Sequence, residues 1–175
     1  MKRNVTTIDK AVSGKDMRLL SRVLRGTTRV RNSISPSVLA TLIRSHAMES
    51  DAKKEALATL ATLPAPASTS DADNSMDVGT DGASDSPATS CSPESGAYLL
   101  ILAVMLTVDA RKGASDATAA VRLVDALVAH LSSLNRRTLD ALTARAFFFY
   151  ARVHELAGSH AGIRSQLLVA YRSAT

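Results

Sequence analysis

Apolar residues in the first part of the chain recur every three or four positions, which is the spacing of amphipathic helices. The first such stretch follows Asp16, a suitable N-cap, and Gly26 is expected to end it. A second helix is predicted to start at Ser35, with Pro36 in its first turn, and a third covers residues 51–63. Because no stretch alternates as a β-strand does, the pattern predicts an all-α fold.

Four further helices are predicted downstream, and the first is a continuous apolar run at residues 97–108. This run is much shorter than the roughly 20 residues that span a bilayer, so it indicates a buried helix. The others cover residues 116–134, 137–156 and 160–171, and Gly158 lies in the connection between the last two. Because only a few residues connect these helices, neighbouring helices must run antiparallel. Antiparallel pairs predict an α-solenoid of the tetratricopeptide type.

A change in composition at Pro64 divides the chain. Residues 64–96 hold four of the five prolines, eight serines and six acidic residues, but no Lys or Arg. Such a segment buries too little apolar surface to offset the entropy of ordering, so it is predicted to be a disordered acidic linker. The predicted organisation is a flexible basic N-terminus at 1–15, a helical block at 16–63, the linker, and a helical-repeat block at 97–175.

The net charge of +5 is unevenly distributed. Residues 1–63 carry 12 basic and 5 acidic side chains, and this basic block is either a solvated face or a contact for an acidic protein or RNA. The Arg-rich start also has some features of a mitochondrial presequence, although Asp9 and Asp16 argue against one. The single cysteine, Cys91, excludes an internal disulfide and a cysteine-based zinc site.

Candidate catalytic groups are sparse. Four histidines, His46, His130, His154 and His160, fit no metal-binding spacing and are expected on the surface or in a groove. The sequence has no glycine-rich phosphate loop and no serine in a nucleophile elbow. It therefore predicts a protein that is not an enzyme and that binds no metal or cofactor.

Four of the six aromatic residues, 147–150, fall in one helical turn and cover most of its circumference. We interpret this turn as part of a helix wedged between neighbours on both sides, with a ligand pocket as the alternative. Arg136 and Arg137 are interpreted as a helix-start network or a solvated face. Contact with nucleic acid is less well supported there, because no aromatic residue interleaves with them.

Several blocks point to a known family. They are the motif Asn-Arg-Arg-Thr-Leu-Asp from Asn135, the aromatic turn ending at Tyr150, Arg164 and the closing Arg-Ser-Ala-Thr. Residues 18–25 and 98–112 agree more weakly, in order and spacing. In these blocks the chain resembles the PCI-family subunits of the proteasome regulatory-particle lid, in the region that leads into their helical repeats.

The resemblance implies a non-catalytic scaffold that acts in ubiquitin-dependent protein degradation, in the cytoplasm and nucleus, with other lid subunits as partners. The short apolar run predicts no membrane partner, and the lack of interleaved aromatic residues argues against nucleic acid as a partner. The resemblance also implies that this chain stops at Thr175, where family members continue through further repeats and a PCI domain. The apolar residues of the last helix are then expected to be exposed and to promote self-association.

The candidate interaction and packing residues combine the basic pair, the aromatic turn and the last helix. They are Arg136, Arg137, Phe147, Phe148, Phe149, Tyr150, Arg164, Leu167, Leu168 and Tyr171. A second hypothesis remains open: a free-standing helical-repeat adaptor that binds an acidic peptide or RNA through the basic N-terminal block.

Overall fold

The computed structural model describes residues 2–31, 33–63, 92–110 and 117–174. Every regular element in these ranges is helical, as the sequence pattern predicts. The elements are α1 (Lys2–Ser13), α2 (Met17–Arg31), α3 (Pro36–His46), α4 (Asp51–Thr62), α5 (Pro93–Ala110), α6 (Thr118–Leu134), the 3-10 helix η1 (Arg137–Leu139), α7 (Asp140–Leu156) and α8 (His160–Ala174).

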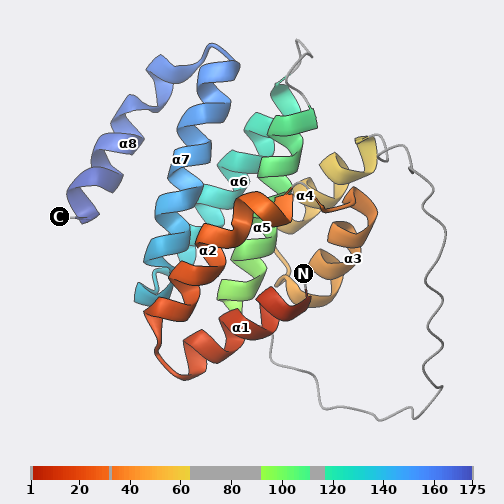
Figure 1. Cartoon of the computed structure of the whole chain (residues 1–175). Coiled ribbons are helices and arrows are strands. Elements are labelled where there is room, and N and C mark those ends of the chain that lie inside the picture. Colours follow the sequence, from red (N-terminus) through yellow and green to blue (C-terminus); the bar gives the residue numbers. More distant parts are fainter. Residues whose placement is uncertain (1, 32, 64–91, 111–116, 175) are drawn as a thin grey trace.

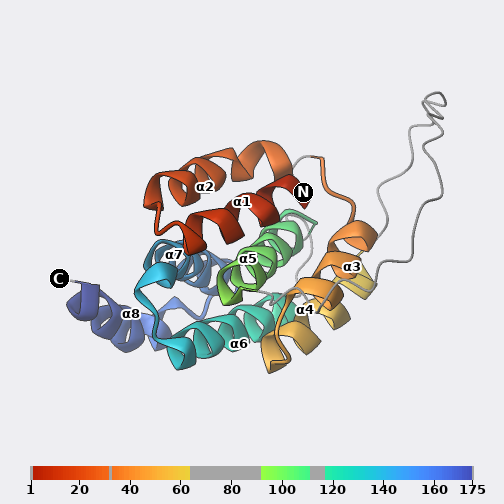
Figure 2. The same ribbon diagram turned by 90° about the horizontal axis from the view of Figure 1, so that it is seen from below.

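The helices stack in layers (Figures 1 and 2). One layer contains α3, α5 and α7, in which α5 packs against both neighbours. A second layer contains α4 and α6, and the hairpin of α1 and α2 covers α5 on its other side. Successive helices from α3 onward therefore alternate between two layers, which is the arrangement of an α-solenoid.

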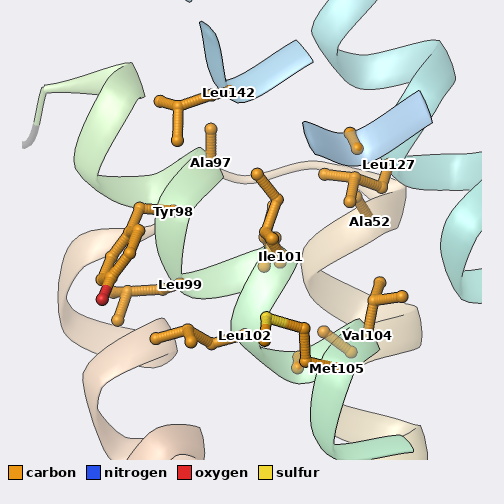
Figure 3. Packing of buried hydrophobic residues seen from close by; sticks show 14 of the residues in the cluster. Ala52, Ala97, Tyr98, Leu99, Ile101, Leu102, Val104, Met105, Leu127 and Leu142 are labelled. Atoms are coloured by element: carbon orange, nitrogen blue, oxygen red, sulfur yellow. The ribbon is translucent and has the colours of Figure 1, made fainter. Parts of the chain in front are cut away.

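Helix α5 forms the centre of the core (Figure 3). It packs against α1, α2, α3, α4, α6 and α7, and every residue from 94 to 105 is buried. A helix enclosed on all sides is apolar around its whole circumference, which confirms the predicted buried helix. By length and composition α5 could also cross a membrane, but 72% of it is buried inside the protein. Its apolar character is thus accounted for by the core.

The N-terminal residues differ from the prediction of a flexible basic segment at 1–15. Residues 2–13 form α1, which buries Val5, Ile8 and Ala11. These side chains pack toward α2 and α5, and the Asn4 amide donates a hydrogen bond of 3.1 Å to the hydroxyl of Tyr98 in α5. A short helix of this kind gains its stability from packing, so its own sequence gives only a weak signal.

The two predicted helical blocks are one packed unit. Helices α3 and α4 pack directly on α5 and α6. Arg31 of α2 forms a bidentate ion pair with Asp109 of α5, which closes the N-terminal hairpin onto the core. The end of the predicted linker is also corrected, since residues 93–96 form the first turn of α5. Residues 64–91, the rest of that linker, lie outside the described residues.

Close packing of α5 against α3 explains why a glycine stands at position 96. A Cβ atom added at Gly96 would lie 3.3 Å from the Cα of Ala47, at the end of α3. Because that neighbour is backbone, a side chain at this position would push α3 and α5 apart.

The predicted starts of α3 and α4 are confirmed. Ser35 precedes α3, with Pro36 in its first turn, and the Ser50 hydroxyl accepts a hydrogen bond from the Lys53 backbone N–H at the start of α4. The buried Lys53 ammonium also donates to the carbonyl oxygen of Ala47 at 3.0 Å, which caps the end of α3. The start predicted at residue 116 for the helix that is α6 lies outside the described residues.

Gly26 does not end α2, which continues to Arg31. The space around a Cβ at Gly26 is open, with no atom within 4 Å. We expect Gly26→Ala to raise the free energy of unfolding by about 0.4–1 kcal/mol, because alanine has the higher helix propensity. The change should appear as a higher urea midpoint.

Gly158→Ala provides the control for Gly26→Ala. Gly158 has φ +71 in the turn between α7 and α8, so alanine is strained there although the space is also open. Its urea midpoint should fall. A lower midpoint for Gly26→Ala would show that α2 is not a regular helix at this position.

Candidate interaction groove

A groove of about 1270 Å³ lies between α6, α7 and α8. It forms because α8 packs mainly on α7 and diverges from the stack, as Figure 1 shows. We call this hollow the α8 groove. Its apolar wall includes Val128 and Leu131 of α6, Phe147 of α7 and Val169 of α8. Polar and charged side chains make up the rest of its lining, so the α8 groove is a mixed apolar and polar surface between the last two helices and the preceding one.

The inner end of the α8 groove is held by a hydrogen bond between helices. The Tyr150 hydroxyl of α7 donates to the Oε1 atom of Gln166 in α8. Burial raises the pKa of Tyr150, and the negative charge of Asp125 raises it further, by a smaller amount. The hydroxyl therefore keeps its proton and remains a hydrogen-bond donor. This contact fixes the distance between α7 and α8 at that level.

A buried histidine links three parts of the groove. The Nε2 atom of His154 lies 3.0 Å from Oδ1 of Asp125 in α6, and its Nδ1 atom lies 2.8 Å from the Ser159 hydroxyl in the turn before α8. The ring packs edge-on against Tyr150, at 4.6 Å between centroids. A carboxylate, an imidazole and a hydroxyl in series also occur in hydrolases. Here the imidazole side chain is buried and joins α6, α7 and the turn, so we interpret the series as structural.

The outer end of the α8 groove is basic. Arg136 and Arg137 line it, and both are exposed. Neither has an ion pair with another described residue. The backbone turns just before them at Asn135, with φ 39, so the predicted helix start at 137 is the 3-10 turn η1 and α7 begins at Asp140. Two free guanidinium groups at this end suit an acidic group on whatever enters the groove.

The four residues of the aromatic turn differ in how far they are buried. Phe149 and Tyr150 are buried, Phe147 is half-buried in the α8 groove, and Phe148 is 60% exposed. The prediction that this helix is enclosed on both sides is therefore wrong on the Phe148 side, where no described helix covers it. There Phe148 lines a second hollow of about 470 Å³ with His160.

The last helix exposes apolar side chains, as predicted. Ile163 is buried and Leu167 half-buried against α7, but Leu168 is 47% and Tyr171 69% exposed. Arg164 is exposed on the same helix. Self-association through this face stays a prediction.

Sequence reasoning missed the polar contacts that shape the groove. Asp125 and His154 are 29 positions apart on different helices, so only the packing of α6 on α7 brings them together. His154 was expected on the surface or in a groove; it lines the α8 groove, where its side chain is buried. The described residues contain no group of three or more His, Cys, Asp or Glu side chains that could hold a metal ion.

The stacked antiparallel helices and the groove between them define the class of protein: an α-solenoid of tetratricopeptide-like repeats, a fold that presents extended surfaces to other molecules. A family model described as "PSMD3-like, N-terminal TPR repeats" matches residues 1–175. The chain belongs to this family.

Named relatives agree with the family model. The chain is 34% identical over its whole length to the probable 26S proteasome non-ATPase regulatory subunit 3 of Drosophila melanogaster, covering 33% of that protein. It is 30% identical, again over its whole length, to the 26S proteasome non-ATPase regulatory subunit 3 of Dictyostelium discoideum, covering 34% of it. It is 27% identical over 98% of its length to the probable 26S proteasome regulatory subunit rpn3 of Schizosaccharomyces pombe, covering 32%. The chain thus spans about a third of the length of the curated relatives it matches.

Proposed function

We propose that this chain is a non-catalytic scaffold element of the proteasome regulatory-particle lid, acting in ubiquitin-dependent protein degradation in the cytoplasm and nucleus. Its family membership and the names of its relatives support this function. On this proposal its partners are other lid subunits, bound through protein contacts. No cofactor is needed for such a role.

One observation carries the proposal: large apolar side chains are exposed on both helices at the α7–α8 end of the stack. Phe148 and Leu156 on α7, with Leu168 and Tyr171 on α8, are each about half exposed or more. In an α-solenoid each repeat buries its apolar face only against a neighbour, so such a face is a surface for packing. We call these four residues the terminal apolar face. A partner protein that packs on the terminal apolar face would extend the stack, and this role needs no catalytic group.

Co-purification with the particle tests the proposal. The tagged chain, expressed in cells, should be recovered with proteasome particles at moderate salt. Leu168→Asp combined with Tyr171→Asp should reduce recovery by about tenfold or more, because each adds a charge to an apolar contact. Immunoblotting for core and lid subunits measures the recovery.

Val38→Asp combined with Met48→Asp is the matched control. These residues are also exposed and apolar, 53% and 47%, but they lie at the α3 end of the stack. Their recovery should stay near that of the unmodified chain. Equal recovery of both double variants would exclude the terminal apolar face as the contact, and no recovery of the unmodified chain would contradict the lid assignment itself.

The second candidate is a free-standing adaptor that binds an acidic peptide or RNA through the basic N-terminal residues. The exposed basic side chains of α1 and α2 favour it. Salt separates the two functions. RNA affinity should fall steeply between about 50 and 200 mM salt because of counterion release. Packing through an apolar face should persist over the same range.

A further inference from the structure

Four arginines form an exposed row on α2. Arg18, Arg22, Arg25 and Arg29 are all exposed, and at 3.6 residues per turn they fall within an arc of about 60°. At 1.5 Å per residue the row is about 16 Å long. Leu20, Val23 and Thr27 on the opposite face of α2 are buried, so the row lies on the side away from the core; α2 itself lies at the outside of the stack (Figure 2). We call these four residues the arginine row.

The described part of the chain gives the arginine row no ion-pair partner. Like charges three or four positions apart weaken a helix, so the row reduces the stability of α2. A fifth arginine of the helix, Arg31, is neutralised by Asp109, but within the described ranges no member of the row has an ion pair. Among the described residues, the one hydrogen bond from a side chain of the row is from Arg25 Nε to the Ser21 carbonyl oxygen, at 3.4 Å. No described acidic side chain therefore compensates the positive charge of the row.

We propose that the arginine row binds an acidic segment of another protein, with carboxylates along one side that pair with the guanidinium groups. The inference rests on the proposed function, a scaffold that acts through protein contacts. A guanidinium group pairs with a carboxylate through two parallel hydrogen bonds, which gives orientation as well as attraction. A row of four such groups selects a run of acidic residues rather than a single one.

Protein fits the row better than nucleic acid does. Single-stranded nucleic acid sites combine basic grooves with aromatic side chains on which bases stack. Residues 1–63, which include α1 to α4, contain no Phe, Tyr or Trp. Helices α1 to α4 therefore offer charge without an aromatic side chain for base stacking.

Binding of a labelled oligoglutamate peptide to the purified chain tests the proposal. Fluorescence anisotropy at about 50 mM salt should show saturable binding, weaker at about 200 mM because the contact is between exposed charges. Arg22→Gln combined with Arg25→Gln, at the centre of the row, should weaken binding by about tenfold, or about 1.4 kcal/mol. Glutamine is a good helix former, and circular dichroism should show an unchanged helix content.

Arg44→Gln combined with Arg122→Gln is the charge-matched control. Both arginines are exposed on other helices, so this variant removes the same net charge away from α2. It should bind within about twofold of the unmodified chain, less than about 0.4 kcal/mol. Equal loss in both variants would show attraction to net charge alone and overturn the proposal. Tighter binding of single-stranded RNA than of oligoglutamate, lost in the α2 variant, would also overturn it.

Particle recovery distinguishes failure of this inference from failure of the proposed function. A chain that co-purifies with the proteasome but does not bind oligoglutamate would keep the scaffold role and exclude the arginine row as an acidic-segment site.

Discussion

Leu102→Ala is expected to lower the free energy of unfolding by about 2–5 kcal/mol, which is the cost of removing a buried leucine side chain from a packed core. Leu102 is fully buried at the middle of α5, where helices from both layers and from the N-terminal hairpin meet. No single neighbour can move to fill the space without losing its own contacts. Urea unfolding followed by circular dichroism measures the change.

Leu168→Ala is the control for Leu102→Ala. The substitution is chemically identical, but Leu168 is 47% exposed on α8. Its effect should stay within about 0.5 kcal/mol, as for surface positions in general. If the two variants lost equal stability, α5 would not be the centre of the core.

The second large effect separates two neighbouring phenylalanines. Phe149→Ala should lower the free energy of unfolding by about 3–5 kcal/mol, because its ring is 7% exposed and fills the α7 side of the core. The ring also lies 5.8 Å from the guanidinium carbon of Arg145. Phe148→Ala, one position earlier and 60% exposed, should change stability little.

Thermal unfolding and particle recovery together make the Phe148 and Phe149 comparison decisive. On the proposed function, Phe148→Ala should keep the unfolding temperature and reduce recovery with the particle, since Phe148 belongs to the terminal apolar face. A large loss of stability for Phe148→Ala would show that a neighbour covers this ring.

Local signals in the sequence were sufficient for most helices. Ser35 and Pro36 mark the start of α3, and the three- and four-residue apolar spacing gives α4, α6 and α8 within a few residues. The continuous apolar run identified α5 as buried, since only an enclosed helix can be apolar on all sides. These features depend on residues close together in the chain.

The arrangement of the helices required information that local spacing does not contain. Arg31 and Asp109 are 78 positions apart, and no local pattern around either residue predicts that the two form an ion pair. Gly26 was expected to end a helix, but packing of α2 on α1 and α5 outweighs one glycine. The same holds for α1, whose Val5 and Ile8 become a core face only when α5 is beside them.

Four of the ten candidate residues predicted from the sequence line the α8 groove, and the groove itself was not predicted. These four are Arg136, Arg137, Phe147 and Tyr150. The contacts of Tyr150 with Gln166 and of His154 with Asp125 and Ser159 set its geometry. They depend on the angle of α8 to α7, which no periodicity in the sequence encodes.

The central position of α5 has a consequence for the growing chain on the ribosome. Translation must add about 48 residues after Thr62 before α5 is complete, which takes about 2–10 s at the usual rate of 5–20 residues per second. During that interval the first four helices exist without the element that buries Leu39, Ile43 and their neighbours. The nascent N-terminal segment therefore keeps these apolar side chains unburied for seconds in every round of synthesis, and such exposure makes a chain prone to aggregation.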